Sequence, residues 1–307
     1  MKRTKTKASA SRLADQRPFH LMLMPGMILL AIFWLVPLIY GLYMPFINYK
    51  PAKGFVGSDF VGLKYFKYML HMKDFQHALV NTVLMAVCKL LLGLIAPVIF
   101  ALLLNEASNK FFNKSLQTVV FFPHFISWVL LAGVMIDFLS PSTGLLNQVL
   151  KFFGHEPIFF LADNKYFRWT MIFSDTWKEF GWGSIIYLAS ISSIDPALYE
   201  SAVIDGAGRF KQALYITLPS MLPLIVLSAV LSMGNILSAN FDQIFNLYSP
   251  TVYETGDVLD TLIYRIGLVN RQYSLSAAVS LVKSIVSICL ISGSYKVAEK
   301  TVGYRVI

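Results

Sequence analysis

The most constraining feature of this sequence is a set of long stretches without charge. No Asp, Glu, Lys or Arg occurs between Arg17 and Lys50, and none occurs between Lys211 and Asp242. A helix needs about 20 apolar residues to cross the hydrocarbon core of a bilayer. Only 14% of the 307 residues are charged, whereas soluble domains carry about 25% charged residues. The chain is therefore expected to be an integral membrane protein.

Six membrane-spanning helices are predicted from these stretches. The fourth is diluted by Asp175, Lys178 and Glu179, but the segments on either side could not both obey the charge bias of membrane proteins without it. Lys89 interrupts the second span and Lys283 the sixth. The six spans are expected at about 19–46, 77–104, 116–139, 169–191, 219–239 and 274–295.

The N-terminal tail carries the clearest orientation signal. Basic residues beside a span favour the cytoplasmic side, so both termini of a chain with six spans are expected in the cytoplasm. The connections 105–115 and 192–218 are then cytoplasmic, and the segments 47–76, 140–168 and 240–273 face outward. The tail residues that give this signal are Lys2, Arg3, Lys5, Lys7, Arg12 and Arg17.

Two other classes of partner are disfavoured by the residue pattern. The net charge of +9 does not form a basic patch with interleaved aromatic residues, so no nucleic-acid partner is expected. The two cysteines lie inside apolar runs, and the five histidines lack the spacing of metal ligands, so no metal site is expected.

One polar segment interrupts the apolar sequence, ESAVIDGAGRFKQALYITLP, residues 200–219. It lies in the predicted cytoplasmic connection between the fourth and fifth spans. Just before it, Asp195 and Pro196 predict an N-cap and a first helical position. Asp205 and Gly206 predict the end of this helix, because glycine tolerates the left-handed conformation.

A second short helix is expected in GRFKQALYI, residues 208–216, and two prolines, Pro219 and Pro223, then open the fifth span. Two short helices around a glycine form a small knob with the Glu200 carboxylate and an apolar face of Leu198, Ala202 and Val203. Such a knob suits docking into a groove on a partner. From these residues alone, a loop that merely joins two spans explains the segment equally well.

The polar segment resembles the EAA signature of permease subunits of binding-protein-dependent ABC importers. That signature has Glu-Ala-Ala, then Asp-Gly-Ala after two residues, and later Ile-x-Leu-Pro. The sequence departs from it at Ser201, where alanine is usual, and at Ala213, where an aromatic residue is usual. The matching positions are Glu200, Ala202, Asp205, Gly206, Ala207, Ile216, Leu218 and Pro219.

Two further stretches are similar to the carbohydrate branch of this family, particularly to permeases for oligosaccharides and polysaccharide fragments. They are FDQIFNLYSPTVYETGDVLDTLIYRIGL, residues 241–268, and FVGLKYFKYML, residues 60–70. The resemblance implies an all-α membrane protein with the six helices of type I importer permeases, in the bacterial cell (inner) membrane. It implies a cytoplasmic N-terminal arm (1–18), a first span with its outer loop (19–74), a permease core (75–295) and a cytoplasmic tail (296–307).

In this family the polar segment forms a coupling helix in a cleft of a cytoplasmic ATPase. The resemblance implies that Glu200 pairs with a basic residue of the ATPase, that Gly206 allows the turn, and that Ala202 and Ala207 permit close approach. No stretch has the spacing of a phosphate loop, so the chain itself is expected to bind no cofactor and to be no enzyme. ATP and magnesium are expected on the ATPase.

The implied partners are two ATPase subunits, a second permease subunit that is usually a related chain, an outer solute-binding protein, the saccharide and membrane lipids. Asp175, Lys178, Glu179 and Trp182 lie on one face of the fourth span, where carboxylates and an indole suit sugar hydroxyls and rings. Further candidates for the substrate pathway are Asn235, Ser238 and Asp242 in the fifth span and Lys283 in the sixth.

The alternative for these polar residues is that they lock helices together, since Lys178 could simply pair with Asp175 or Glu179. For the whole chain, the main alternative is a secondary transporter driven by an ion gradient. That class often has repeated halves and broken helices, and the sequence indicates neither. A membrane-embedded enzyme is not supported, because no cluster of catalytic spacing lies within a span.

Overall fold

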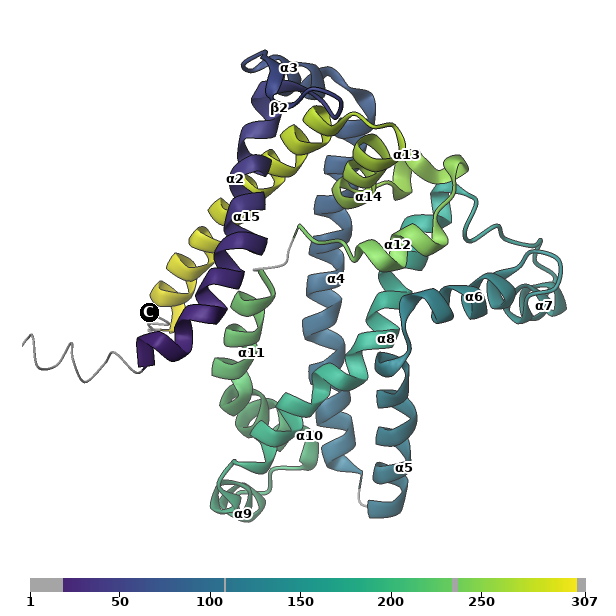
Figure 1. The fold of residues 1–307 in the computed structure, drawn as a ribbon. Coiled ribbons are helices and arrows are strands. Elements are labelled where there is room, and N and C mark those ends of the chain that lie inside the picture. Colours follow the sequence, from purple (N-terminus) through teal and green to yellow (C-terminus); the bar gives the residue numbers. More distant parts are fainter. Residues whose placement is uncertain (1–18, 108, 234–236, 303–307) are drawn as a thin grey trace, which may run out of the picture.

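The computed structural model describes residues 19–107, 109–233 and 237–302, and nearly all of this part is helical (Figure 1). One small antiparallel sheet, which the sequence did not predict, joins strands β1 (Ile47–Lys50) and β2 (Gly54–Phe60) with Ile47 opposite Phe60. The turn between them has Pro51 at its second position, where proline is favoured, and Gly54 has a positive φ of 65°. The fold class is thus the expected all-α membrane type.

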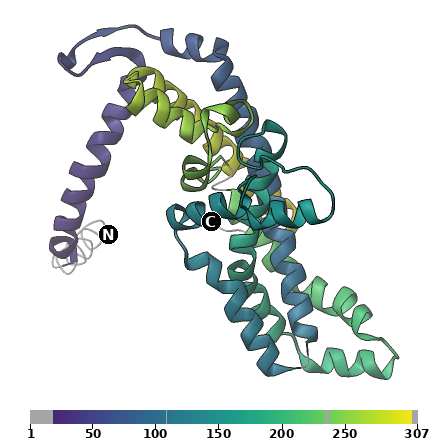
Figure 2. The same ribbon diagram turned by 90° about the vertical axis from the view of Figure 1, so that its right-hand side faces the viewer.

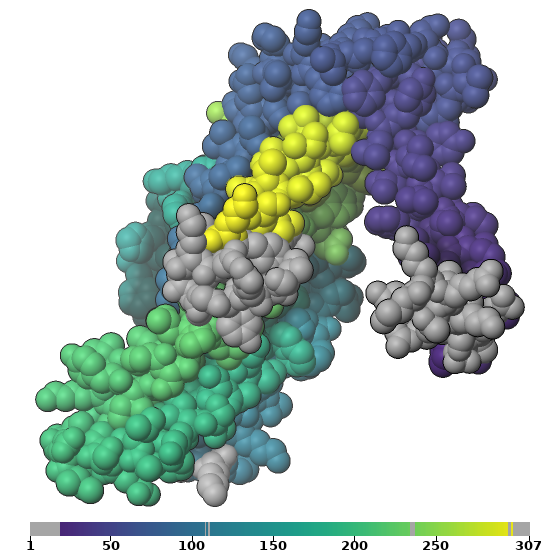
Figure 3. Space-filling view, turned by 90° about the vertical axis from the view of Figure 1, so that its left-hand side faces the viewer, coloured from purple at the N-terminus to yellow at the C-terminus, as the bar shows by residue number. Residues whose placement is uncertain are grey.

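The first span is the helical segment Phe19–Phe46, which includes the π-helical η1 (Ala31–Leu35), α2 (Val36–Tyr43) and the 3-10 helix η2 (Met44–Phe46). None of its most apolar window is buried. It meets the rest of the chain at its C-terminal end, where the Tyr49 amide just beyond it donates to the Ser274 hydroxyl at 2.9 Å. Figures 2 and 3 show its other end standing away from the body. This helix is therefore left open to lipid or to another chain.

The core of the fold is the packing of α4 (Lys73–Glu106) against α8 (Asn164–Ser192). Two glycines of α8 let neighbouring segments approach closely: Gly183 faces α4, and Gly181 leaves room for the backbone of Val120. A Cβ on Gly183 would lie 3.2 Å from the Pro97 ring in α4, and a Cβ on Gly181 would lie 2.3 Å from the carbonyl oxygen of Val120. Small residues at such crossings let helices pack closely in membranes.

The third predicted span, 116–139, is wrong as a single helix. The chain forms α5 (Lys110–Phe121), the 3-10 turn η3 (Phe122–Phe125) and α6 (Trp128–Leu139), and the two halves meet at 106°. Pro123 lacks an amide donor and disfavours a continuing helix. Ser127 is extended and caps α6 by accepting a hydrogen bond from the Leu130 amide at 3.4 Å. The prediction used only the apolar character of the stretch, which does not reveal a bend between two helices.

The fifth predicted span, 219–239, is wrong at both ends. One helical segment runs from Arg209 to Met233 through α10 (Arg209–Gln212), the π-helical η4 (Ala213–Thr217) and α11 (Leu218–Met233). The expected separate short helix is therefore part of the span. In η4 the Leu218 amide bonds back to the Ala213 carbonyl, and this wider turn precedes the two prolines, which the helix accommodates. Residues 237–240 are not helical, and α12 (Phe241–Leu247) follows them.

Within the part of the chain that the structure describes, four helices are long and apolar enough to cross a membrane, or five if the bent pair α5 to α6 is one span. The fourth predicted span, 169–191, corresponds to α8, which has 29 residues but carries Asp175, Lys178 and Glu179. The final span is α15 (Tyr273–Val302). The remaining short helices outside the polar segment 195–218 are α3 (Lys64–His71), α7 (Leu145–Phe152), η5 (Pro250–Val252), α13 (Tyr253–Gly256), α14 (Leu259–Tyr264) and the π-helical η6 (Arg265–Val269).

We expect Gly181→Ala to lower the stability of the detergent-solubilised protein by about 1–3 kcal/mol, the usual cost of overpacking. The added methyl group would push α5 away from α8. Gly93→Ala is the matched control, since a Cβ at that helical position meets nothing within 4 Å. Thermal unfolding of both variants checks this; equal transition temperatures would contradict the close crossing.

Candidate functional site

The polar segment between the fourth and fifth spans begins with α9 (Pro196–Ile204), as the sequence predicts. The Asp195 carboxylate accepts a hydrogen bond from the Ala197 amide at 3.0 Å. At the other end, the Gly206 amide bonds to the Val203 carbonyl and the Ala207 amide to the Ala202 carbonyl. With a φ of 76° at Gly206, this is a Schellman cap. Both ends of α9 are therefore fixed by local bonds.

Two longer contacts hold α9 and the turn after it, here called the elbow (residues 195–208), against the body. The Tyr199 hydroxyl lies 2.9 Å from the Thr217 hydroxyl in η4. The Arg209 guanidinium donates to the Glu106 carbonyl at 3.3 Å, at the end of α4. The elbow and the α4 end lie together at one end of the molecule, opposite the β1–β2 sheet (Figure 1).

The residues that match the EAA signature differ in exposure. Glu200, Asp205, Gly206 and Pro219 are exposed, while four apolar members are half-buried, Ala202, Ala207, Ile216 and Leu218. Two apolar side chains outside the predicted apolar face are the most exposed here, Ile204 at 86% and Phe210 at 81%. Their only sequence signal was apolar character within a polar segment. The elbow thus presents a carboxylate beside uncovered apolar surface.

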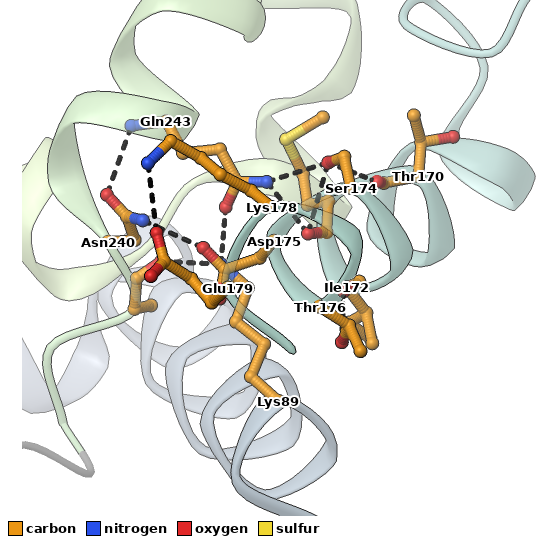
Figure 4. Close-up of polar contacts among 12 residues, drawn as sticks. Lys89, Thr170, Ile172, Ser174, Asp175, Thr176, Lys178, Glu179, Asn240 and Gln243 are labelled. Carbon is orange, nitrogen blue, oxygen red and sulfur yellow. Dashed lines mark hydrogen bonds and ion pairs between the residues drawn. The ribbon is translucent and has the colours of Figure 1, made fainter. Parts of the chain in front are cut away.

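A polar network joins α4, α8 and the start of α12 (Figure 4). The Asp175 carboxylate accepts a hydrogen bond from the Asn240 side chain at 2.8 Å and lies 3.7 Å from the Lys89 ammonium. The Lys89 ammonium also donates to the Ala239 carbonyl at 3.1 Å and to the Gln243 side chain. Asp175 is thus engaged by two elements far apart in the sequence.

Gln243 closes this network and was not singled out from the sequence. It is fully buried, and its amide donates to the Met171 carbonyl and to the Ser174 hydroxyl, both at 2.8 Å. A buried amide without partners would be costly, so these bonds tie α12 firmly to α8. In the sequence, only the position of Gln243 next to the Asp242 carboxylate in an apolar segment indicated a polar site.

The other residues of the predicted α8 face, Lys178, Glu179 and Trp182, lie around His124 of η3. The buried Lys178 ammonium donates to the His124 carbonyl at 2.9 Å and to Glu179 at 3.0 Å. The other Glu179 oxygen lies 2.7 Å from the His124 ring nitrogen, and the Trp182 ring stacks on His124 with centroids 4.6 Å apart. His124 was not predicted as a site residue, although a histidine inside an apolar stretch is itself a functional signal.

These contacts divide the four α8 residues by exposure. Asp175 and Lys178 are largely enclosed by protein, as expected if they lock helices together. The Glu179 side chain is 40% exposed and Trp182 is 45% exposed, so both offer surface to a ligand. The Trp182 ring also meets Phe125 edge to face at 5.4 Å. An aromatic surface beside a carboxylate suits saccharides.

The predicted face of the fifth span does not exist as one helix. Asn235 lies outside the described residues. Ser238 is exposed in the non-helical stretch, and Asp242 is exposed on α12. The prediction of one shared face assumed an unbroken helix through residue 242, but residues 237–240 are not helical.

Lys283 of α15 forms an ion pair with Asp260 of α14, which matches the alternative of a partner carboxylate. Asp260 also lines a cavity of about 450 Å³ between α12, α14 and α15. Its walls include the aromatic and hydroxyl side chains of Phe241, Tyr264, Tyr273, Ser276 and Ser280. A larger cavity of about 680 Å³ between α6, α7 and α8 has almost entirely apolar walls.

A second charged cluster lies where the first turn of α4 meets the segment 257–265, because Arg265 pairs with Asp257 and with Asp74 of α4. Burial raises the pKa of the Asp257 carboxyl, while hydrogen bonds from the Thr261 hydroxyl and the Arg265 guanidinium act in the opposite direction. Among residues 19–107, 109–233 and 237–302, no three His, Cys, Asp or Glu side chains are placed to share a metal ion.

Comparison with known proteins gives a consistent result. Residues 90–291 match the family described as "Binding-protein-dependent transport system inner membrane component". The polygalacturonan/rhamnogalacturonan transport system permease YteP of Bacillus subtilis (strain 168) is 37% identical over 97% of this chain and 93% of its own length.

Two solved structures share the fold. One belongs to a bacterial ABC transporter involved in the import of the acidic polysaccharide alginate, with a TM-score of 0.87, 37% identity, and coverage of 96% of this chain and 99% of that chain. The other is a bacterial alginate ABC transporter in complex with an alginate pentasaccharide-bound periplasmic protein, with a TM-score of 0.84, 38% identity, and coverage of 94% and 96%. The chain is therefore a multi-pass membrane protein that belongs to the family of inner membrane components of binding-protein-dependent transport systems.

Proposed function

We propose that this chain is one permease subunit of an ATP-driven importer for oligosaccharides or polysaccharide fragments. The observation that carries this proposal is the elbow at one end of the molecule, whose α9 is capped at both ends and exposes Glu200 and Ile204, with Phe210 exposed just after it. The substrate class follows from the relatives, whose names refer to polygalacturonan, rhamnogalacturonan and alginate.

In this proposal the elbow binds an ATPase subunit, and Glu200 pairs with a basic residue of that subunit. The Schellman cap at Gly206 gives α9 a defined end without help from a partner. Exposed apolar surface of this kind marks interaction sites on proteins. Closure of the ATPase dimer on ATP and magnesium would then displace the elbow and, with it, the helix that begins at Arg209.

The substrate would pass the exposed part of the α8 face and the cavity beside α12. Trp182 and Glu179 combine an aromatic plane with a hydrogen-bond acceptor. Phe241 and Tyr264 line the 450 Å³ cavity with ring centroids 5.8 Å apart. Sugar rings stack on aromatic planes, and their hydroxyl groups bind carboxylates. Lys283 and Asp242 are the charged groups proposed beside this path.

The other partners follow from the shape of the chain. A second permease subunit, a related chain, would complete the pore and cover the open side of the first span, whose most apolar part is not buried at all (Figure 3). Two ATPase subunits would bind at the elbow end, and a solute-binding protein would deliver substrate to the outer end. The N-terminal arm and the C-terminal tail are then cytoplasmic, and residues 75–295 form the permease core.

One observation favours a different energy source, because the fifth span is interrupted in the way that helices of ion-driven transporters often are. Between Met233 and Phe241 the described residues 237–240 are not helical. An ion-driven transporter would have no need of the exposed elbow. Purification of the chain from its native membrane decides between the two, since only the ATP-driven importer carries an ATPase subunit through gentle detergent extraction.

We expect Glu200→Lys to insert normally and to lose the ATPase activity that the substrate-loaded binding protein stimulates. The charge reversal would repel the basic residue proposed on the ATPase, and loss of a buried charged partner at an interface costs about 2–5 kcal/mol. The measurement is ATP hydrolysis by the reconstituted complex. Glu156→Lys, at an exposed acid beyond α7, is the control. Normal coupled transport by the Glu200 variant would contradict the docking role.

We expect Trp182→Ala to raise the half-saturating concentration for uptake about three- to tenfold, because aromatic contacts contribute about 0.5–1.5 kcal/mol. Glu179→Gln should raise it in the same direction by removing the charged acceptor. Trp177→Ala is the matched control, since Trp177 lies on the same helix but lines the apolar cavity. Unchanged apparent affinity in both test variants would count against this path.

A further inference from the structure

At the interruption of the fifth span, a backbone carbonyl outside any helix receives its hydrogen bond from a lysine of another helix. Residues 237–240 are not helical, and Leu237 and Ala239 are buried. Backbone groups within a membrane need partners inside the protein. The Ala239 carbonyl receives its hydrogen bond from the Lys89 ammonium at 3.1 Å, and Lys89 lies near the middle of the 34-residue helix α4.

The three hydrogens of the Lys89 ammonium have three acceptors around them. These are the Ala239 carbonyl, the Gln243 side-chain oxygen and the Asp175 carboxylate of α8. The Lys89 side chain is only 9% exposed, so it has little contact with anything outside the protein. One cation therefore connects α4 and α8 with the end of the interruption and the start of α12 (Figure 4).

The residue that restarts the helix is held by the same carboxylate. Asn240 has a left-handed φ of 63° and caps α12 by accepting a hydrogen bond from the Gln243 amide at 3.3 Å. Its side-chain amide donates to Asp175 at 2.8 Å. The exposed residues Ser238 and Asp242 flank Ala239 and Asn240, so their positions follow from these bonds.

We propose that Lys89 is a positioning residue for the substrate pathway. Its ammonium holds the interruption of the fifth span against Asp175, and this fixes where Ser238 and Asp242 meet the substrate. The inference rests on the proposed function, because it takes these two residues as pathway groups. Lys89 itself does not touch the substrate.

The test uses the complete importer in membrane vesicles and three variants. Lys89→Met keeps an apolar stem of similar length and removes the ammonium. Lys89→Met combined with Asp175→Asn removes both charges, so that no buried carboxylate is left unpaired. Lys151→Met, at an exposed lysine of α7, is the control. Uptake of labelled galacturonan fragments gives the half-saturating concentration and the maximal rate.

We expect Lys89→Met to raise the half-saturating concentration by about tenfold or more, since small misplacements of binding groups have effects of that size. The double variant should not recover, because Ala239 and Gln243 still lack their cation. Recovery of the wild-type value in the double variant would overturn the proposal, since Lys89 would then only balance the charge of Asp175. Loss of both variants from the membrane would also overturn it, by making Lys89 a residue required for folding.

A second measurement reads the position of the loop without substrate. Cys88 and Cys289 are first replaced by serine, and Ser238→Cys is then labelled with a water-soluble thiol reagent. We expect the labelling rate to change severalfold in both Lys89 variants and to stay constant in Lys151→Met. An unchanged rate would refute the positioning role. If the unmodified importer takes up no galacturonan fragments, the proposed substrate class fails, while the labelling result still tests Lys89.

Discussion

A helix that stops inside a bilayer leaves backbone groups that only the protein can satisfy, and much of this structure depends on how that demand is met. In the fifth span the described residues 237–240 are not helical, and a new helix begins at Phe241. The partners for this interruption come from α4 and α8, and α4 can approach α8 closely because Gly183 carries no side chain. The polar network around Asp175 therefore depends on the packing of these two helices.

The elbow and this polar network are connected by one helical segment. It begins at Arg209, immediately after the elbow, and ends at Met233, just before the interruption. A continuous helix is stiff, so a displacement of the elbow would be carried along this segment to Met233. This arrangement gives a physical route from energy coupling to the substrate pathway, within the function proposed above.

Local signals in the sequence predicted local structure well. Asp195 and Pro196 mark the start of α9, and Gly206 marks its end, because caps and left-handed residues depend on a few neighbouring atoms. The length of the uncharged stretches predicted most of the spans, because a helix needs about 20 apolar residues to cross the bilayer. The two prolines of the fifth span were misleading, since one helical segment, Arg209–Met233, continues through both of them.

What could not be predicted depends on contacts between distant residues. The bond from Lys89 to Gln243 joins positions 154 residues apart, and that from His124 to Glu179 joins positions 55 apart. No periodicity within one segment contains such information. The α8 face was identified correctly as polar, yet its division into enclosed Asp175 and Lys178 and exposed Glu179 and Trp182 required the neighbouring helices.

The central claim is that this chain imports saccharide fragments with energy borrowed from an ATPase. Its most direct test is uptake of labelled galacturonan fragments into vesicles that contain the purified complex, with ATP and the solute-binding protein supplied separately. The account predicts uptake only when both are present, and no uptake from an ion gradient alone. Uptake driven by an ion gradient without ATP would contradict it.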